Sequence, residues 1–232
     1  MFGGAPFRLS NYMSRTRFDE ILVALQYTNH KNVDFEDGFF HMQQMEEAWN
    51  QNMEDEFIPS WMSILDESMM EWFNKYCPGF MCVGHKPHPF GNERHTICCA
   101  LTSIMFRALI VEGKDRPKEL GPKEYSNLGT TVRLMLQMCK PLFRSGKAMV
   151  MDSGFCVSDG IVALAEKGVY AAALIKKRRY WPKGVPRDAI KTYFANKEVG
   201  NNKMFESKSA SGKSFRIFCM KEPDYTMKVM LS

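Results

Sequence analysis

Two aspartates at the ends of predicted strands could form a metal-binding carboxylate pair. Asp66 ends a short strand candidate at 63–66, and Asp152 directly follows an apolar run at 148–151. If these strands are parallel neighbours in one sheet, the carboxylates converge although 86 residues separate them. Mg²⁺ and Mn²⁺ prefer carboxylate and water ligands, and paired ions of this kind drive phosphodiester displacement. The alternative is that both acids are ordinary strand-end or loop residues.

A second candidate site is basic. Residues 171–232 contain fourteen Lys or Arg against five Asp or Glu, a local balance of +9. This composition suits a polyanion such as DNA, whose phosphates dominate non-specific affinity. Within it, cations next to Tyr180 and Trp181 could clamp phosphates beside stacking surfaces. We predict DNA contacts by Lys176, Lys177, Arg178, Arg179 and Lys183. A nuclear-localisation patch or a solvated loop remains the alternative.

A third candidate is a zinc site at Cys77, Cys82, His85 and His88, whose residue types fit tetrahedral Zn²⁺. Its spacing is too compressed for the common zinc-finger pattern, and three prolines restrict it further. We therefore favour a loop with free thiols and solvated histidines. The seven cysteines are an odd number and accompany no recognisable secretion signal, which favours reduced thiols inside the cell.

The elements that must position these residues follow from hydrophobic periodicity. Helical spacing at 14–27, capped by Ser14, and at 39–57 predicts a helical N-terminal region, residues 1–60. Further helices are expected at 128–142 and 157–167, the second ending at Gly168. Strands are expected at 63–66, 97–101, 105–111, 148–151, 170–175, 203–207, 214–219 and 227–231.

The order of these elements predicts an α/β fold with a ribonuclease-H-like mixed sheet flanked by helices. Three early strands, two of them a hairpin, precede strands that alternate with helices. We assign the core to 61–180 and the strand-rich C-terminal part to 181–232. The sequence stops inside a strand candidate, which suggests a piece of a longer protein. No stretch reaches 18 uninterrupted apolar residues, so no membrane association is expected.

Several blocks resemble, in order, those of piggyBac-type transposases. Residues 64–69, Ile-Leu-Asp-Glu-Ser-Met, are similar to the first catalytic block of that family. Residues 86–91, Lys-Pro-His-Pro-Phe-Gly, resemble its Lys-Pro-x-x-aromatic-Gly segment, and residues 151–155, Met-Asp-Ser-Gly-Phe, resemble its second catalytic block. Residues 13–18 resemble the start of its helical DNA-binding and dimerisation region. The similarity covers nearly the whole chain.

The resemblance implies cut-and-paste DNA transposition in the nucleus, driven by Mg²⁺ or Mn²⁺ held by three aspartates. Two of the three correspond to Asp66 and Asp152, as catalytic residues and metal ligands. The third is expected beyond Ser232, after a β-rich insertion to which the C-terminal strands would belong. The implied partners are DNA, as transposon ends and an AT-rich target, and a second copy of the chain in a homodimer.

Two departures from the family pattern favour a non-catalytic alternative. Ser153 replaces the Asn that usually follows the second acid, and Glu93 stands where the family tends to have a basic residue. Such changes are typical of domesticated copies that serve as DNA-binding or protein-interaction modules. A more distant alternative is an unrelated metal-dependent nuclease on the same sheet.

Overall fold

The computed structural model describes residues 9–25, 37–71, 75–84, 86–113, 125–175, 181–209, 212–224 and 227–232. The chain divides into two compact units, Met1–Met45 and Glu46–Ser232. In the first unit, helix α1 (Arg15–Ala24) begins at the predicted cap, because the Ser14 hydroxyl accepts a hydrogen bond from the Arg17 amide at 3.2 Å. None of the residues of α1 is buried.

Helix α2 (Phe40–Glu56) spans the boundary between the units, and its residues 46–56 belong to the second. The Asn50 side chain donates to the Ala108 carbonyl and accepts from the Ala108 amide, both at 2.8 Å. These bonds satisfy backbone groups on β4, which lies at the edge of its hairpin and would otherwise expose them. The helix therefore protects the edge of the sheet.

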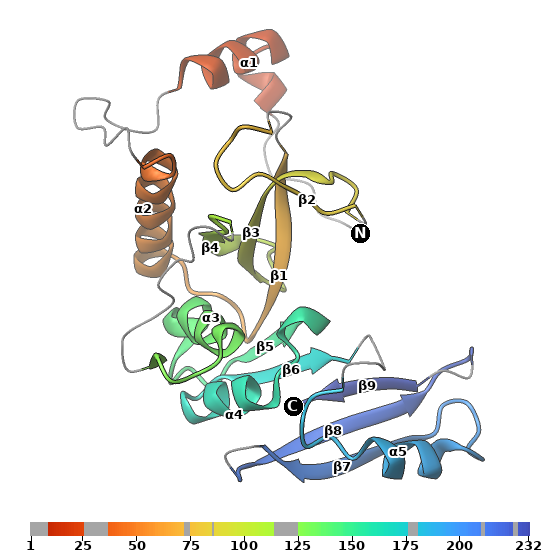
Figure 1. The fold of residues 1–232 in the computed structure, drawn as a ribbon. Coiled ribbons are helices and arrows are strands. Elements are labelled where there is room, and N and C mark those ends of the chain that lie inside the picture. The colour runs from red at the N-terminus through yellow and green to blue at the C-terminus, as the bar shows by residue number, and fades with distance from the viewer. Residues whose placement is uncertain are drawn as a thin grey trace. The chain divides into compact units, whose positions relative to one another are not determined.

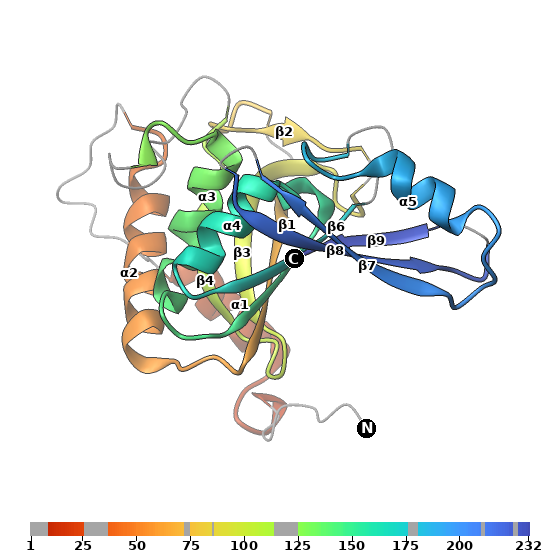
Figure 2. The same cartoon turned by 90° about the horizontal axis from the view of Figure 1, so that it is seen from below.

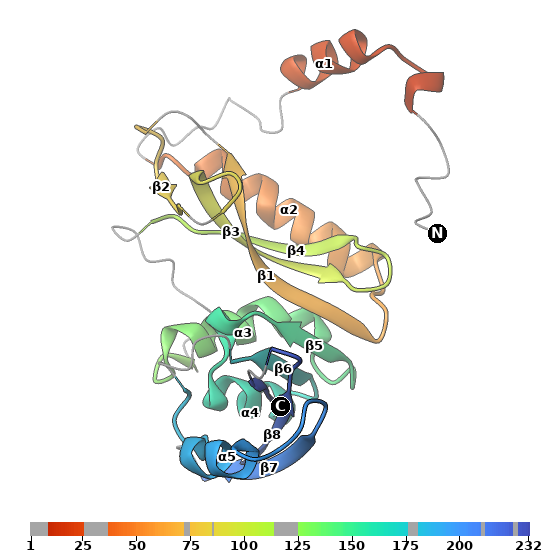
Figure 3. The ribbon, with the colours of Figure 1, turned by 90° about the vertical axis from the view of Figure 1, so that its right-hand side faces the viewer.

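The second unit is built on a mixed sheet flanked by helices, as predicted (Figure 1). Its strands have the order β2-β3-β1-β5-β6-β9-β8-β7, and β4 also pairs with β3. The first half comprises β1 (Met62–Glu71), β2 (Met81–Cys82), β3 (Phe90–Cys99) and β4 (Met105–Ile110). The second half comprises β5 (Ala148–Met151), β6 (Tyr170–Leu174), β7 (Asn202–Lys208), β8 (Ser214–Lys221) and β9 (Met227–Leu231). Figure 3 shows β1, β3 and β4 as neighbouring strands.

The strand directions are those of the predicted topology. β1 is antiparallel to β3 and parallel to β5, and β5 is parallel to β6. Parallel neighbours need a crossover connection, which α3 (Thr130–Cys139) and α4 (Ser158–Glu166) provide. β6 then pairs with β9 in antiparallel fashion, so the C-terminal strands extend the same sheet.

The core lies where α3 and α4 pack on the buried side chains of β1 and β5. Leu65, Met149 and Met151 belong to one buried cluster with Met135 of α3. α4 can approach α3 closely because it carries Gly160, where a Cβ would lie 2.6 Å from the Met135 sulfur. After α4 the chain reverses at Gly168, whose φ of 74° favours glycine, as the sequence predicted.

The structure also shows elements that the sequence did not predict. β1 continues five residues past Asp66, because its partner β3 starts at Phe90 rather than near residue 97. The two-residue strand β2 and helix α5 (Arg187–Phe194) were missed. α5 lies along the β7–β8 hairpin (Figure 2), where the Tyr193 ring contacts the Phe205 ring edge-on. Among the described residues, no helix has the length and apolar character that crossing a membrane requires.

The alternation of faces along β1 gives a paired stability prediction. Leu65 is fully buried, whereas its neighbour Ile64 is 42% exposed. We expect Leu65→Ala to lower the free energy of unfolding by about 2–5 kcal/mol, because it opens a cavity in the core. Ile64→Ala should cost about 1 kcal/mol or less. Urea denaturation of both variants measures the difference, and equal losses would contradict the assignment of the buried face.

Candidate functional site

The register of β1 and β5 brings the two candidate aspartates to neighbouring positions. The parallel pairing of these strands ends at Leu65 and Met151, so Asp66 and Asp152 are the next residues on adjacent strands. Side chains alternate between the faces of a sheet. Since Leu65 and Met151 are buried on one face, both aspartates belong to the other. Asp66 is exposed and Asp152 is half-buried, so both are accessible from solvent.

The local backbone orients both carboxylates. Asp66 Oδ1 accepts a hydrogen bond from the Glu67 amide at 2.8 Å. Asp152 precedes a 3₁₀ turn, Ser153–Phe155, in which the Phe155 amide donates to the Asp152 carbonyl at 3.1 Å. The Asp152 side chain makes no capping bond to that turn. Its carboxylate oxygens are therefore not used in holding the turn.

Lys86 supplies a positive charge beside these acids. Its Nζ donates to the Glu67 carbonyl at 2.9 Å, which ties the Lys-Pro loop to β1. Burial and the Glu93 carboxylate raise the pKa of Glu67, Lys86 opposes this increase, and the charges of Asp66 and Asp152 add to it. The acids that act on Glu67 thus come from β1, from β3 and from the end of β5, and Lys86 partly offsets their effect on Glu67.

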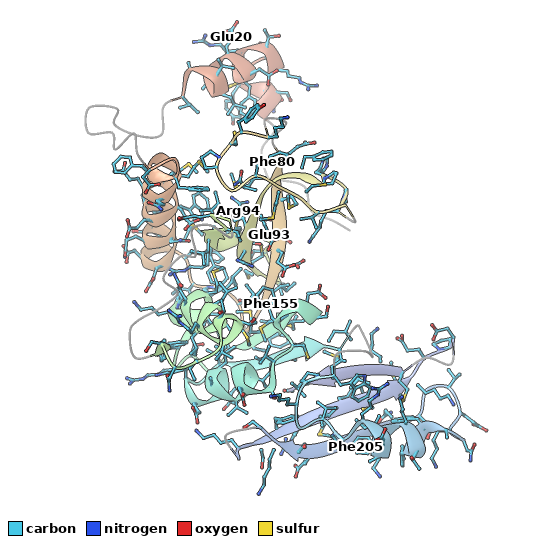
Figure 4. The ribbon with its side chains drawn as sticks, in the orientation of Figure 1. Glu20, Phe80, Glu93, Arg94, Phe155 and Phe205 are labelled. Atoms are coloured by element: carbon cyan, nitrogen blue, oxygen red, sulfur yellow. The ribbon has the colours of Figure 1, made fainter. Side chains whose placement is uncertain are left out.

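A second group of ligand-type residues lies on the opposite face of β1 from Asp66. Glu67 is directly opposite His95 on β3, and Glu93 precedes His95 by two residues. One ligand atom from each of the three lies within 4.8 Å of the others. Burial lowers the pKa of His95 to about 4, so its imidazole is neutral near pH 7. Figure 4 labels Glu93 on β3 and also labels Phe155. The Phe155 ring meets the His95 ring edge-on, with the ring centroids 5.7 Å apart.

Sequence reasoning did not identify this group, although part of its signal was present. Glu93 and His95 alternate along what proves to be a strand, which puts both on one face. Their approach to Glu67 depends on the pairing register of β1 and β3, which no local pattern reveals.

The predicted DNA-binding stretch is only partly described. Lys176, Lys177, Arg178 and Arg179 lie outside the described residues. Lys183 is exposed, and its carbonyl accepts a hydrogen bond from the Ser158 hydroxyl at 3.2 Å. Trp181 is half-buried and packs against the hydrophobic core, so only part of its ring faces solvent.

The cysteine and histidine loop does not gather into a metal site where it is described. All seven cysteines are free thiols. His88 Nδ1 lies 3.2 Å from an exposed carboxylate oxygen of Glu71, and His85 lies outside the described residues. Across the described ranges, the three-residue group of Glu67, Glu93 and His95 is the candidate metal cluster.

Comparison with known families and structures gives two further findings. The family model described as transposase IS4 matches residues 5–232. No curated protein sequence matches the chain. The expectation of a transposase is therefore supported over nearly the whole sequence.

The fold is similar to that of piggyBac transposase, solved by cryo-EM as a synaptic complex with hairpin DNA. The TM-score is 0.69 at 16% sequence identity, and the match covers 95% of this chain and 43% of the other. This confirms the predicted ribonuclease-H-like fold. The chain thus spans less than half of that transposase. The catalytic domain of human endonuclease V matches with a TM-score of 0.32 at 9% identity, over 82% of this chain and 80% of the other.

The contact of Lys86 with β1 gives a stability prediction for this region. We expect Lys86→Met to lower the free energy of unfolding by about 1–2 kcal/mol, because it removes a charged hydrogen bond to a backbone carbonyl. The control is Lys183→Met, since the Lys183 side chain is exposed. Thermal or urea denaturation measures both. Equal stability of the two variants would show that the Lys-Pro loop does not anchor β1.

Proposed function

The chain belongs to the transposase IS4 family, and we propose that Asp66 and Asp152 form the metal-binding carboxylate pair of a DNA strand-cleavage and strand-transfer site. The observation that carries this proposal is the parallel register of β1 and β5. This register pairs Leu65 with Met151, so Asp66 and Asp152 are the next residues on two adjacent strands. Their separation by 86 residues makes this meeting a property of the fold rather than of local sequence.

The residues present fit Mg²⁺ or Mn²⁺. Both side chains offer hard oxygen ligands on the same face of the sheet, and the cap geometry leaves the Asp152 carboxylate free of the following turn. When bound, such ions activate the attacking oxygen and stabilise the leaving oxygen of a phosphodiester. The chain itself contributes rigid positioning, because the β1–β3 ladder and the Glu67 amide hold Asp66 in place.

DNA is the proposed substrate and partner. The basic balance of residues 171–232 supports this, as does the presence of hairpin DNA in the complex of the structurally similar piggyBac transposase. Phosphate contacts are proposed for Lys176, Lys177, Arg178, Arg179 and Lys183, and the target is proposed to be AT-rich. We propose a nuclear location, because the protein would meet a DNA substrate there.

A homodimer is proposed as the working assembly. Helix α1 supports it, because its apolar side chains are not buried within the chain: Val23 is 89% exposed and Leu22 is 45% exposed. A second copy would cover such a surface. The alternative function is a non-catalytic DNA-binding or protein-interaction module, which the replacement of Asn by Ser153 favours.

Cleavage of DNA tests the carboxylate pair. We expect Mn²⁺-dependent nicking of supercoiled plasmid to fall by about 100-fold or more in Asp66→Asn and in Asp152→Asn, since even indirect partners of metal ligands are worth 10–100-fold. The control Asp188→Asn removes an exposed carboxylate from the first turn of α5 and should retain full activity. Nicking that survives both active-site substitutions would refute the proposal. DNA binding without any nicking, in a protein that also contains the expected third aspartate, would favour the non-catalytic alternative.

The salt dependence of DNA binding tests the basic stretch. Substituting Lys176, Lys177, Arg178 and Arg179 by Ala should reduce the steepness of log K against log salt by about 3.6, because each of four phosphate contacts contributes roughly 0.9. The control variant removes Lys213, Arg216 and Lys228, whose charges are already paired with Glu166, Glu206 and Glu222. Fluorescence anisotropy with a labelled duplex measures both slopes. A larger change in the control than in the basic-stretch variant would contradict the assignment.

A further inference from the structure

We propose that Glu67, Glu93 and His95 form a second metal site, distinct from the Asp66–Asp152 pair, which binds a Zn²⁺-type transition metal. The pairing of β1 with β3 creates it. Glu67 and His95 are direct cross-strand partners, and Glu93 stands two residues before His95 on the same face. Cross-strand neighbours of this kind have Cβ atoms about 4.5–5.5 Å apart, which is suited to sharing one ion.

The ligand atoms are already gathered. One ligand atom from each residue lies within 4.8 Å of the other two, and His95 Nε2 lies 3.4 Å from Glu93 Oε1. The side chains of His95 and Glu93 are only 13% and 24% exposed. Since all three residues sit on paired strands rather than on loops, little ordering is needed for them to coordinate an ion.

The His95 ring presents Nε2 to the carboxylates, since this is the nitrogen 3.4 Å from Glu93 Oε1. The other ring nitrogen, Nδ1, is buried and has no hydrogen-bond partner. No protein hydrogen bond to Nδ1 therefore fixes which ring nitrogen carries the proton. A neutral imidazole is also the form that binds metals.

The third ligand lies against a glycine. The Glu67 carboxylate is so close to Gly154 that an added Cβ would come within 2.9 Å of Glu67 Oε1. The turn after Asp152 therefore leaves room for the Glu67 carboxylate because it has a glycine at this position.

The local charge also favours a cation here. Glu67 and Glu93 are two carboxylates in one half-buried cluster, and Asp66 and Asp152 add their charges from the other face of β1. Lys86 is the positive group whose charge acts on Glu67, and its Nζ donates to the Glu67 carbonyl. A divalent ion would offset repulsion that one lysine offsets only in part.

The ligand set distinguishes this site from the aspartate pair. Two carboxylate oxygens and one imidazole nitrogen suit Zn²⁺, which takes four ligands and leaves one position for water. Mg²⁺ prefers oxygen ligands in octahedral geometry and retains several waters. Zn²⁺ should therefore bind here while Mg²⁺ occupies the aspartate pair.

The test is calorimetric titration of the purified chain with ZnCl₂ in excess Mg²⁺. The wild type should bind Zn²⁺, and Glu93→Gln and His95→Gln should each weaken binding by about 100-fold or more. Matched controls are Glu71→Gln and His88→Gln. These two residues also form a Glu–His contact, Glu71 lies on β1 as Glu67 does, and both side chains are exposed. Both controls should bind as the wild type does. Thermal denaturation without metal verifies that each variant is folded.

The aspartate variants separate this inference from the proposed function. Asp66→Asn and Asp152→Asn should leave Zn²⁺ affinity within a few-fold of the wild type, even where they abolish nicking. The inference fails if the wild type does not bind Zn²⁺, or if binding is unchanged in Glu93→Gln and His95→Gln. It also fails if the Asp66 and Glu93 variants lose Zn²⁺ equally, since a single shared site would then explain both.

Discussion

The parallel pairing of β1 with β5 is the constraint on which the rest of the structure depends. Only four residue pairs make up this contact, yet they decide which side chains of both strands are buried. A shift of one residue would turn Leu65 outward and bury Asp66, because successive side chains point to opposite faces. The burial of Leu65 and Met151 in one core therefore fixes the position of the two aspartates.

The same alternation divides the acids of β1 between two faces. Asp66 and Glu67 are consecutive, so their side chains lie on opposite faces of the sheet, Glu67 on the face that also carries Glu93 and His95. Burial and the Glu93 carboxylate raise the pKa of Glu67, and the charges of Asp66 and Asp152 add to this increase. Lys86 links the two sides, since its ammonium group binds the backbone at Glu67. This gives the Lys-Pro segment a physical role in the fold.

Much of the fold could be predicted from the sequence, because its buried elements carry strong periodicity. The helices at α3 and α4 and the strand at β5 are apolar on their core-facing positions, and they were found near their true bounds. The start of β3 was missed because residues 91–96 are mostly polar or small, which does not resemble a strand. α5 was missed because it is short, and only Ile190 and Phe194 mark its buried face.

The two candidate sites also differ in how far the sequence could predict them. Asp66 and Asp152 could be paired in advance, since each follows an apolar run and the element order predicts the neighbouring strands. The group of Glu67, Glu93 and His95 depends on cross-strand register, which local sequence does not encode. Glu93 was first notable as a departure from the piggyBac-type pattern, in which a basic residue tends to occupy that position.

In the structure this departure changes the charge of a half-buried cluster. A basic side chain there would neutralise Glu67, whereas a carboxylate adds to its charge and requires a cation or a proton to offset it. The departure therefore alters which ions this face of the sheet can hold.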